Sequence, residues 1–299
     1  MFLSQSLFIR LATSILIAAM GLTSALFYAK AHDGNEQLAG VVLDRAADKR
    51  ARDASRHPVQ TLSFFHLEPS MRVAEALPGT GWYSEIIANY LGENGALYGI
   101  NYNESMWPLF GFFTPERIEQ MSARTAAFPE LVANLADNGI TAGGFTFDTA
   151  PKNLNSTLDR VLFVRALHNL ARFESEAGTL SQALKVTYEL LKDDGLVGVV
   201  QHRAPANADD KWADGSAGYL KESFVIERFE DAGFELVAKS EINANSKDKP
   251  TTDDIVWRLP PSFNGTGDDP AKRAAVEAIG ESDRMTLLFK KKGAKVRLH

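Results

Sequence analysis

The sequence predicts an α/β protein with one doubly wound sheet of about seven strands, mostly parallel with an antiparallel last strand and with helices on both faces. Two observations support this fold class. Short apolar runs alternate along the chain with amphipathic segments of helical length, which is typical of a parallel sheet. The first of these runs leads through a glycine turn into the start of a helix.

The expected strands are short and follow one another at regular spacing. The first begins at Arg72, and the others are residues 96–101, 144–148, 160–165, 196–202, 234–240 and 285–289. The fourth and fifth are apolar and β-branched enough to be buried on both faces. Helices are expected at about 179–192 and 221–232, so the order of elements predicts a Rossmann-like sheet.

The turn after the first strand is the most informative local feature. Gly79 and Gly81 lack a Cβ, so the chain can turn tightly there and present bare backbone to a ligand. The following helix begins with unpaired N–H groups. Glu75 lies at the carboxyl end of the strand, where open α/β sheets bind ligands. The turn therefore suits a ligand that contains adenosine.

The chain resembles a family of exported bacterial proteins classed as class I S-adenosylmethionine-dependent methyltransferases. The resemblance covers roughly residues 45–291 and rests on these segments: 57–65, 73–85, 165–169, 191–203, 232–234 and 282–284. It implies that Glu75, Gly79 and Gly81 surround the methionine and ribose parts of S-adenosyl-L-methionine. Two positions depart from the family pattern, because Leu77 stands where a glycine is common and Asn101 replaces the ribose-binding acid.

The cofactor site expected from this resemblance also includes neighbours of the turn and of the second strand. Its residues are Glu75, Gly79, Thr80, Gly81, Trp82, Tyr83, Asn101 and Glu104. Further aromatic residues near the loop edge, Tyr102, Trp107 and Phe110, are suited to stack on adenine or to cover a sulfonium.

Two histidines are the expected catalytic residues. His168 follows the fourth strand and His202 ends the fifth, so both imidazoles are expected at one crevice, where a neutral imidazole can act as a general base. The substrate side of the crevice is expected to contain Arg56, His57, Arg165, Asn169 and Arg203. Pro58 is expected to hold His57 in an extended conformation.

Composition excludes several other classes of function. The chain has no cysteine, which removes disulfides and thiolate metal sites. Asp148, His168 and His202 lack any short-range metal-ligand motif, so no metal is expected. A net charge of −6 argues against broad contact with nucleic acid. The expected partner is a small-molecule methyl acceptor.

The amino terminus predicts export to the periplasm. Residues 1–31 have a basic start, an uncharged apolar run and a small-x-small end at Ala31, which is typical of a cleaved signal peptide and leaves no stable membrane span. An uncleaved anchor is the alternative. The expected organisation continues with a helical arm at 32–58, a methyltransferase-like domain at 59–291 and a basic tail at 292–299. Within the domain, residues 243–280 are expected to form an irregular insertion or lid.

Two other functions stay open at this stage. A non-catalytic binding protein of the same fold would tolerate the loss of the acid at position 101. An NAD(P)-dependent oxidoreductase would use Gly79-x-Gly81-x-x-Ser84 as a degenerate dinucleotide loop, although Asn101 lacks the carboxylate expected for the ribose.

Overall fold

The protein is described by a computed structural model that covers residues 35–296. The predicted signal peptide and its cleavage site after Ala31 lie outside the described residues, as do the last three residues of the basic tail. Among residues 35–296, no helix is both long enough and apolar enough to cross a membrane.

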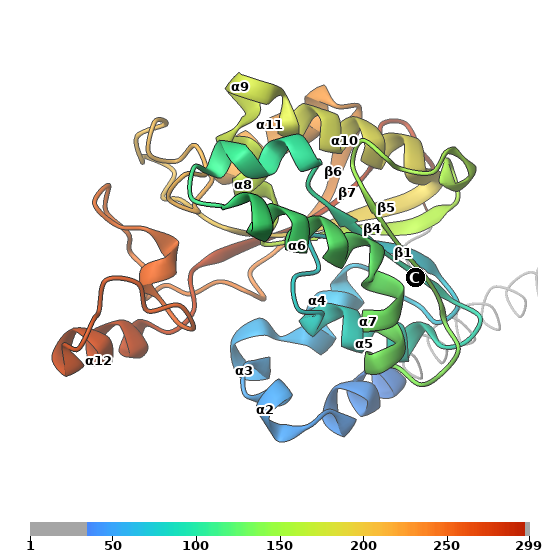
Figure 1. Cartoon of the computed structure of the whole chain (residues 1–299), viewed down its shortest axis with the longest axis horizontal. Helices are drawn as coiled ribbons and strands as arrows, with labels where there is room; N and C mark the ends of the chain where they lie inside the picture. The colour runs from blue at the N-terminus through green and yellow to red at the C-terminus, as the bar shows by residue number, and fades with distance from the viewer. Residues whose placement is uncertain (1–34, 297–299) are drawn as a thin grey trace, which may run out of the picture.

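A single seven-stranded sheet forms the centre of the molecule (Figure 1). Its strands are β1 (Arg72–Ala76), β2 (Ala96–Asn101), β3 (Thr141–Thr146), β4 (Leu158–Val164), β5 (Leu191–His202), β6 (Phe234–Ser240) and β7 (Arg284–Lys291). The spatial order is β3-β2-β1-β4-β5-β7-β6. The first five strands pair in parallel, while β7 runs antiparallel to both β5 and β6. The predicted fold class is therefore confirmed.

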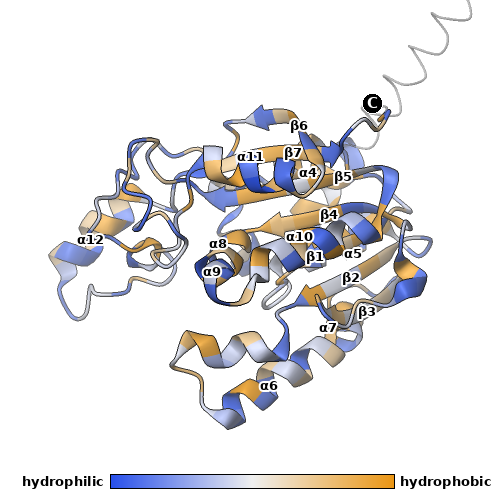
Figure 2. Cartoon of the chain, turned by 90° about the horizontal axis from the view of Figure 1, so that it is seen from above, coloured by the Kyte–Doolittle hydropathy of each residue, from blue (hydrophilic) through white to orange (hydrophobic). Residues whose placement is uncertain are grey.

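Helices cover both faces of the sheet, and each face has its own apolar core. Alternate strand residues supply the two cores: Val161 faces α8 (Leu167–Arg172), α10 (Thr179–Leu190) and α11 (Glu222–Asp231), whereas Leu162 faces the opposite layer. That second layer consists of α4 (Pro58–Phe64), α5 (Trp82–Leu91), α7 (Phe128–Leu135) and the helical residues 35–44. The strands between the layers are largely hydrophobic (Figure 2), as expected for a sheet buried on both faces.

Several boundaries differ from the sequence prediction. The third strand occupies residues 141–146 rather than 144–148, because its start pairs with the start of β2 and a hydrogen-bonded turn at Thr146 and Thr149 ends it. The chain also enters β5 directly after α10, at Leu191. Between β2 and β3 the sequence analysis assigned no helix, but the structure has η1 (Glu104–Phe110), α6 (Pro115–Ala126) and α7.

Two segments outside the sheet complete the carboxyl edge. The arm before β1 contains the short helices α2 (Ala47–Arg50) and α3 (Asp53–Arg56). The segment between β6 and β7 contains η3 (Val256–Arg258) and α12 (Pro270–Ile279), which projects at one end of the molecule (Figure 1). This helix was not expected in the irregular insertion, although Asp269 caps its N-terminus and Pro270 occupies its first turn.

Candidate active site

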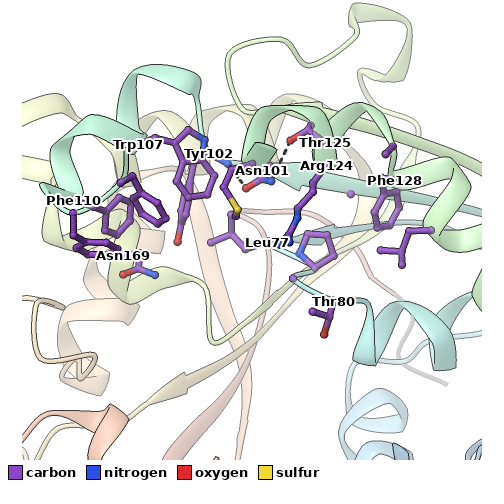
Figure 3. A pocket seen from close by; sticks show the side chains of 18 of the residues that line it. Leu77, Thr80, Asn101, Tyr102, Trp107, Phe110, Arg124, Thr125, Phe128 and Asn169 are labelled. Carbon is purple, nitrogen blue, oxygen red and sulfur yellow. Dashed lines mark hydrogen bonds between the residues drawn. The ribbon is translucent and has the colours of Figure 1, made fainter. Parts of the chain in front are cut away.

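A cavity of about 750 Å³ lies at the carboxyl ends of β1 and β2. One wall is the turn Leu77–Thr80, and the opposite wall comes from α6 and α7. Aromatic side chains of the segment after β2 close one end, and Phe128 lies at the other (Figure 3). The lining is Leu77, Pro78, Gly79, Thr80, Gly99, Asn101, Tyr102, Trp107, Phe110, Phe112, Phe113, Met121, Arg124, Thr125, Ala127, Phe128, Leu131, Asn169, Arg172, Trp257 and Asn264. Such a mostly apolar lining with few polar groups is typical of a small-molecule site.

The backbone of the turn is held in conformations that favour glycine. Gly79 and Gly81 have φ values of 61° and 83°, and Leu77 has a φ of 55°. A leucine in this left-handed region is strained, and it stands at the position where the family pattern often has glycine. The Leu77 N–H donates to the carbonyl of Ile100, so the end of β2 holds the turn in place.

The two glycines have different neighbours. A Cβ on Gly79 would meet only the Leu77 carbonyl oxygen, at 4.0 Å, so this residue presents bare backbone to the cavity. A Cβ on Gly81 would instead lie 2.7 Å from Leu135 of α7. Gly81 therefore allows helix packing, and it does not line the cavity.

Glu75 lies beneath the turn and outside the cavity lining. It is buried, and its Oε2 accepts a 2.6 Å hydrogen bond from the Ser84 hydroxyl. Burial raises the pKa of Glu75 to about 7, against the opposing effects of Ser84 and of the positive charge on Arg165. The structure thus places this carboxyl as a buried support of the β1–α5 turn, where sequence analysis expected a direct ligand contact.

Asn101 lines the cavity at the end of β2, as expected, but its amide already has partners. Its Oδ1 accepts a hydrogen bond from the Tyr102 N–H at 2.9 Å, and its Nδ2 donates to Thr125 Oγ1 at 3.1 Å. Figure 3 shows both groups beside Arg124, which extends from α6 toward Leu77. Glu104, expected nearby, is exposed at the start of η1 and does not line the cavity.

The two histidines come together, as sequence analysis expected. The ring centroids of His168 and His202 are 5.4 Å apart. Burial lowers the pKa of His168 to about 4 and also lowers the pKa of His202, so both imidazoles are neutral at pH 7. His202 Nδ1 lies 2.6 Å from the Ser282 hydroxyl. Neither histidine lines the cavity, and the Trp257 ring, which does, is 5.8 Å from His168.

Of the expected substrate residues, only Asn169 lines the cavity. Arg203 is held by carboxylates, with 2.9 Å to Asp283 and 2.7 Å to Glu241. His57 was expected to be extended, but its φ of 43° and ψ of 54° are left-handed. The reason is that His57 joins two helices: its N–H caps α3 by donating to the Asp53 carbonyl, and α4 begins at the next residue.

Arg56 and Arg165 belong to a second group of side chains, together with Trp82 and Tyr83. The Arg56 guanidinium lies over the Trp82 ring, with 4.3 Å from Cζ to the centroid. The Tyr83 hydroxyl donates to the Arg56 carbonyl at 3.3 Å. Trp82 and Tyr83, expected beside the cofactor, therefore pack against the amino-terminal arm and do not line the cavity.

Sequence analysis missed about two thirds of the residues that line the cavity. Phe112, Phe113 and Arg124 come from the unassigned region after β2, and Trp257 and Asn264 come from the segment between β6 and β7. The density of phenylalanines around position 112 was the one available signal. Among residues 35–296, no group of three or more histidine or carboxylate side chains is arranged to hold a metal ion.

No protein-family model matches the chain, and no curated protein matches it in sequence. Several of the solved structures that it resembles are described as methyltransferases. A complex of the Haloferax volcanii Trm112 methyltransferase activator with a protein described as a methyltransferase matches at a TM-score of 0.50 and 14% identity, over 83% of this chain and 95% of that chain.

Two further structures show weaker similarity. The cyclase SpnF matches with a TM-score of 0.48 and 15% identity, covering 80% of both chains. An S-adenosylmethionine-dependent methyltransferase from Aquifex aeolicus matches with a TM-score of 0.43 and 17% identity, over 70% of this chain and 93% of that chain. At 14% identity, the likeness to the Haloferax volcanii complex shows a shared fold and nothing beyond it.

Proposed function

We propose that the protein is an S-adenosylmethionine-dependent methyltransferase that acts on a small-molecule acceptor. The observation that carries this proposal is the cavity at the carboxyl ends of β1 and β2, with bare backbone at Gly79 on one wall and aromatic rings at one end. Ligands of open α/β sheets bind at this edge. A fold shared with methyltransferases agrees with the proposal but does not decide the activity.

The residues present fit the adenosyl part of the cofactor. The space beside Gly79 is free of protein atoms, so a ligand can approach the turn as closely as its backbone allows. Asn101 offers an amide at the end of β2, and Met121 and Phe128 offer apolar surface. When bound, S-adenosylmethionine supplies a methyl group activated by a positively charged sulfonium. The rings of Tyr102 and Trp107 attract such a charge.

The other end of the cavity is the proposed acceptor side. Asn169 and Arg172 line it from α8, and Trp257 and Asn264 line it from the segment between β6 and β7. Because His168 is buried, has a pKa of about 4 and does not line the cavity, it is poorly placed to remove a proton from an acceptor. The proposed mechanism therefore depends on holding the acceptor in line and excluding water.

Calorimetric titration tests the ligand class. The protein is titrated separately with S-adenosylmethionine, S-adenosylhomocysteine and NAD. Binding of both adenosyl compounds without binding of NAD supports the proposal, and transfer of a labelled methyl group to candidate acceptors then tests the activity. Binding of NAD alone would instead support the oxidoreductase alternative.

A second candidate is a non-catalytic ligand-binding protein of the same fold. It is favoured by the composition of the cavity, because no aspartate or glutamate is among the described residues that line it and both polar atoms of Asn101 are engaged. Adenosyl binding without turnover against a broad panel of acceptors would favour this candidate.

We also propose that the protein acts outside the cytoplasm, on the basis of the signal-like residues 1–31. Amino-terminal sequencing of the protein purified from the periplasmic fraction is expected to give His32 as the first residue. Recovery of the chain from the membrane with Met1 intact would support a retained anchor instead.

A further inference from the structure

Beside the cavity, arginines from distant parts of the chain converge at the carboxyl edge of the sheet. Arg52 and Arg56 come from the arm around α3, Arg165 follows β4, and Arg284 begins β7. Glu281 lies among them, and burial opposed by these four positive charges leaves its pKa below the usual range. We call these five residues the arginine cluster.

Glu281 supplies the carboxylate of the arginine cluster, and the four arginines lie at different distances from it. Its carboxylate is 2.6 Å from Arg52 and 3.1 Å from Arg284. The Nε of Arg56 is 3.6 Å away and makes no hydrogen bond. Arg165 makes no hydrogen bond or ion pair through its guanidinium with any described residue, and its Nε is buried. Four guanidinium groups therefore share one carboxylate.

Apart from the Trp82 ring beneath Arg56, the surrounding side chains do little to compensate this charge. His168 and His202 are neutral at pH 7, since burial lowers the pKa of both. Glu75 acts on Arg165, but burial raises its pKa to about 7, so it carries on average about half a charge at neutral pH. Desolvation and the nearby charge of Arg165 lower the pKa of Arg56 to about 9. Arg56 therefore keeps its proton at neutral pH, and the positive charges of Arg56 and Arg165 repel each other.

An uncompensated buried charge destabilises the folded state, and binding of a counter-ion relieves this destabilisation. The backbone supports the same conclusion, because Arg165 has a φ of 59°, a strained conformation for a side chain of this size. Strain and unpaired charge at one residue are expected where a ligand completes the structure. Arg165 is also half-buried rather than fully enclosed, so water-sized groups can reach it.

We propose that Arg56, Arg165 and Arg284 form a binding site for a compact oxyanion, a carboxylate or a phosphate. Planar guanidinium groups match the paired oxygens of such anions. The site borders the cavity through His168, whose ring is 5.4 Å from His202 near the cluster and 5.8 Å from cavity-lining Trp257. If the proposed methyltransferase function holds, on which this last step rests, the bound anion is a carboxylate or phosphate group of the methyl acceptor.

Thermal unfolding in buffers of matched ionic strength tests the site, with inorganic phosphate and sodium acetate as separate probes. At a hundredfold excess over Kd, a ligand specific for the folded state raises Tm by about 5 °C for a chain of this size. We expect this shift in the wild type and its loss in Arg165→Gln. Without the anion, Arg165→Gln is expected to melt at or above the wild-type temperature, because repulsion is relieved. The lower of the two half-saturating concentrations distinguishes a phosphate site from a carboxylate site.

Arg273→Gln on α12 is the matched control, because Arg273 is half-exposed and paired with Glu277 at 3.1 Å. The Arg273→Gln variant is expected to show the same rise in Tm on adding the anion as the wild type. Phosphate also stabilises proteins by general exclusion from their surface, so an equal shift in wild type, Arg165→Gln and Arg273→Gln would overturn the proposal. A fall in Tm of Arg165→Gln without anion would also overturn it, because it would mean that Arg165 stabilises the fold. If phosphate raises the Tm of the wild type but S-adenosylhomocysteine does not bind, the anion site is supported and the proposed function is refuted.

Discussion

At one end of the carboxyl edge, beside β1 and β2, the cavity is walled by bare backbone, aromatic rings and apolar side chains. Beside β4, β5 and β7, the same edge carries the arginine cluster, where four guanidinium groups surround Glu281. The first region is open and mostly apolar, with Arg124 and Arg172 as its charged residues, whereas the second is crowded with charge. One edge of a sheet thus offers two chemically different places for parts of a ligand.

This difference begins in the sequence of each strand end. After β1 the chain uses Gly79, which leaves room for a ligand, while after β4 it places Arg165 in a similar left-handed conformation. Both residues have a left-handed backbone, which glycine adopts easily and arginine adopts only with strain. Gly79 presents main-chain atoms to a ligand, whereas Arg165 presents a charged side chain. The predictions below separate the two regions, beginning with the largest expected effect.

Replacing Gly79 with valine is expected to weaken S-adenosylhomocysteine binding by more than about a hundredfold, because the side chain would fill the space beside the turn. Calorimetry on protein of verified folding measures the change. The matched control is Gly139→Val, since Gly139 has a similar φ of 73°, has open space around its Cβ position and does not line the cavity.

Both valine variants have the same type of backbone strain, so both are expected to lose some stability, about 1 to 3 kcal/mol. Only Gly79→Val is expected to lose binding. Equal affinities in the two variants would mean that the turn is structural and that the cavity does not use it.

Glu75→Gln is expected to change stability in a pH-dependent way. The pKa of Glu75 is raised by burial from 4.5 to about 7, so the folded state binds more protons than the unfolded state between these values. Wild-type stability therefore falls as pH rises through this window, with a full cost of about 3 kcal/mol above it. Glutamine is neutral at every pH, so the variant should gain up to this amount relative to wild type at pH 8 and little at pH 4.

Denaturant unfolding at both pH values measures this gain. If Glu75→Gln is less stable than wild type at pH 8 by a similar amount, the carboxylate is ionised and paired, and Arg165 is then its partner. That result would join the two regions into one ionic network.

Asn101→Asp is expected to strengthen S-adenosylhomocysteine binding by about 1 kcal/mol, or about fivefold, because a carboxylate accepts stronger hydrogen bonds from ribose hydroxyls. The change keeps the local structure: the oxygen that accepts from Tyr102 is retained, and the Thr125 hydroxyl can donate to the new oxygen. Calorimetry checks the affinity. Weaker binding in Asn101→Asp would place the ribose elsewhere in the cavity.

The smallest effect is expected from His168→Gln. Its ring is neutral, buried and 3.3 Å from the Gln201 Oε1 atom, so we expect turnover to change by less than about threefold at pH 7 once an acceptor is known. A rate measurement corrected for the folded fraction tests this. A loss of a hundredfold or more would restore the general-base role that the sequence suggested.

The sequence was sufficient for the sheet but only partly for the site. Apolar runs located every strand, and the bounds of β2 and β6 agree with those expected. Burial of β2 on both faces leaves a continuous apolar signal, whereas β6 is a half-buried edge strand. The turn at Gly79 and the ends of β2 and β4 also identified one wall of the cavity. The other wall was missed, since α6 is mainly polar, has no fully buried residue, and packs against the core only through the partly buried Ile118 and Met121.

The direction in which side chains point was the second property that could not be predicted from the sequence. Trp82 and Tyr83 follow the glycine turn in sequence, yet the first turn of α5 points them toward Arg56 and the amino-terminal arm. A one-residue joint between two helices likewise set the conformation of His57, against the preference that its neighbour Pro58 imposes. Such choices depend on contacts between distant segments, which no local pattern encodes.

Gly144 on β3 allows α6, one wall of the cavity, to lie in direct contact with the sheet. A Cβ at this position would lie 1.8 Å from the Thr125 carbonyl, so α6 rests directly on the backbone of β3 near its carboxyl end. This contact makes the α6 wall a fixed part of the sheet, and lifting it would require separating the helix from the strand. We therefore expect a ligand to enter and leave at the end of the cavity lined by η1, Trp257 and Asn264.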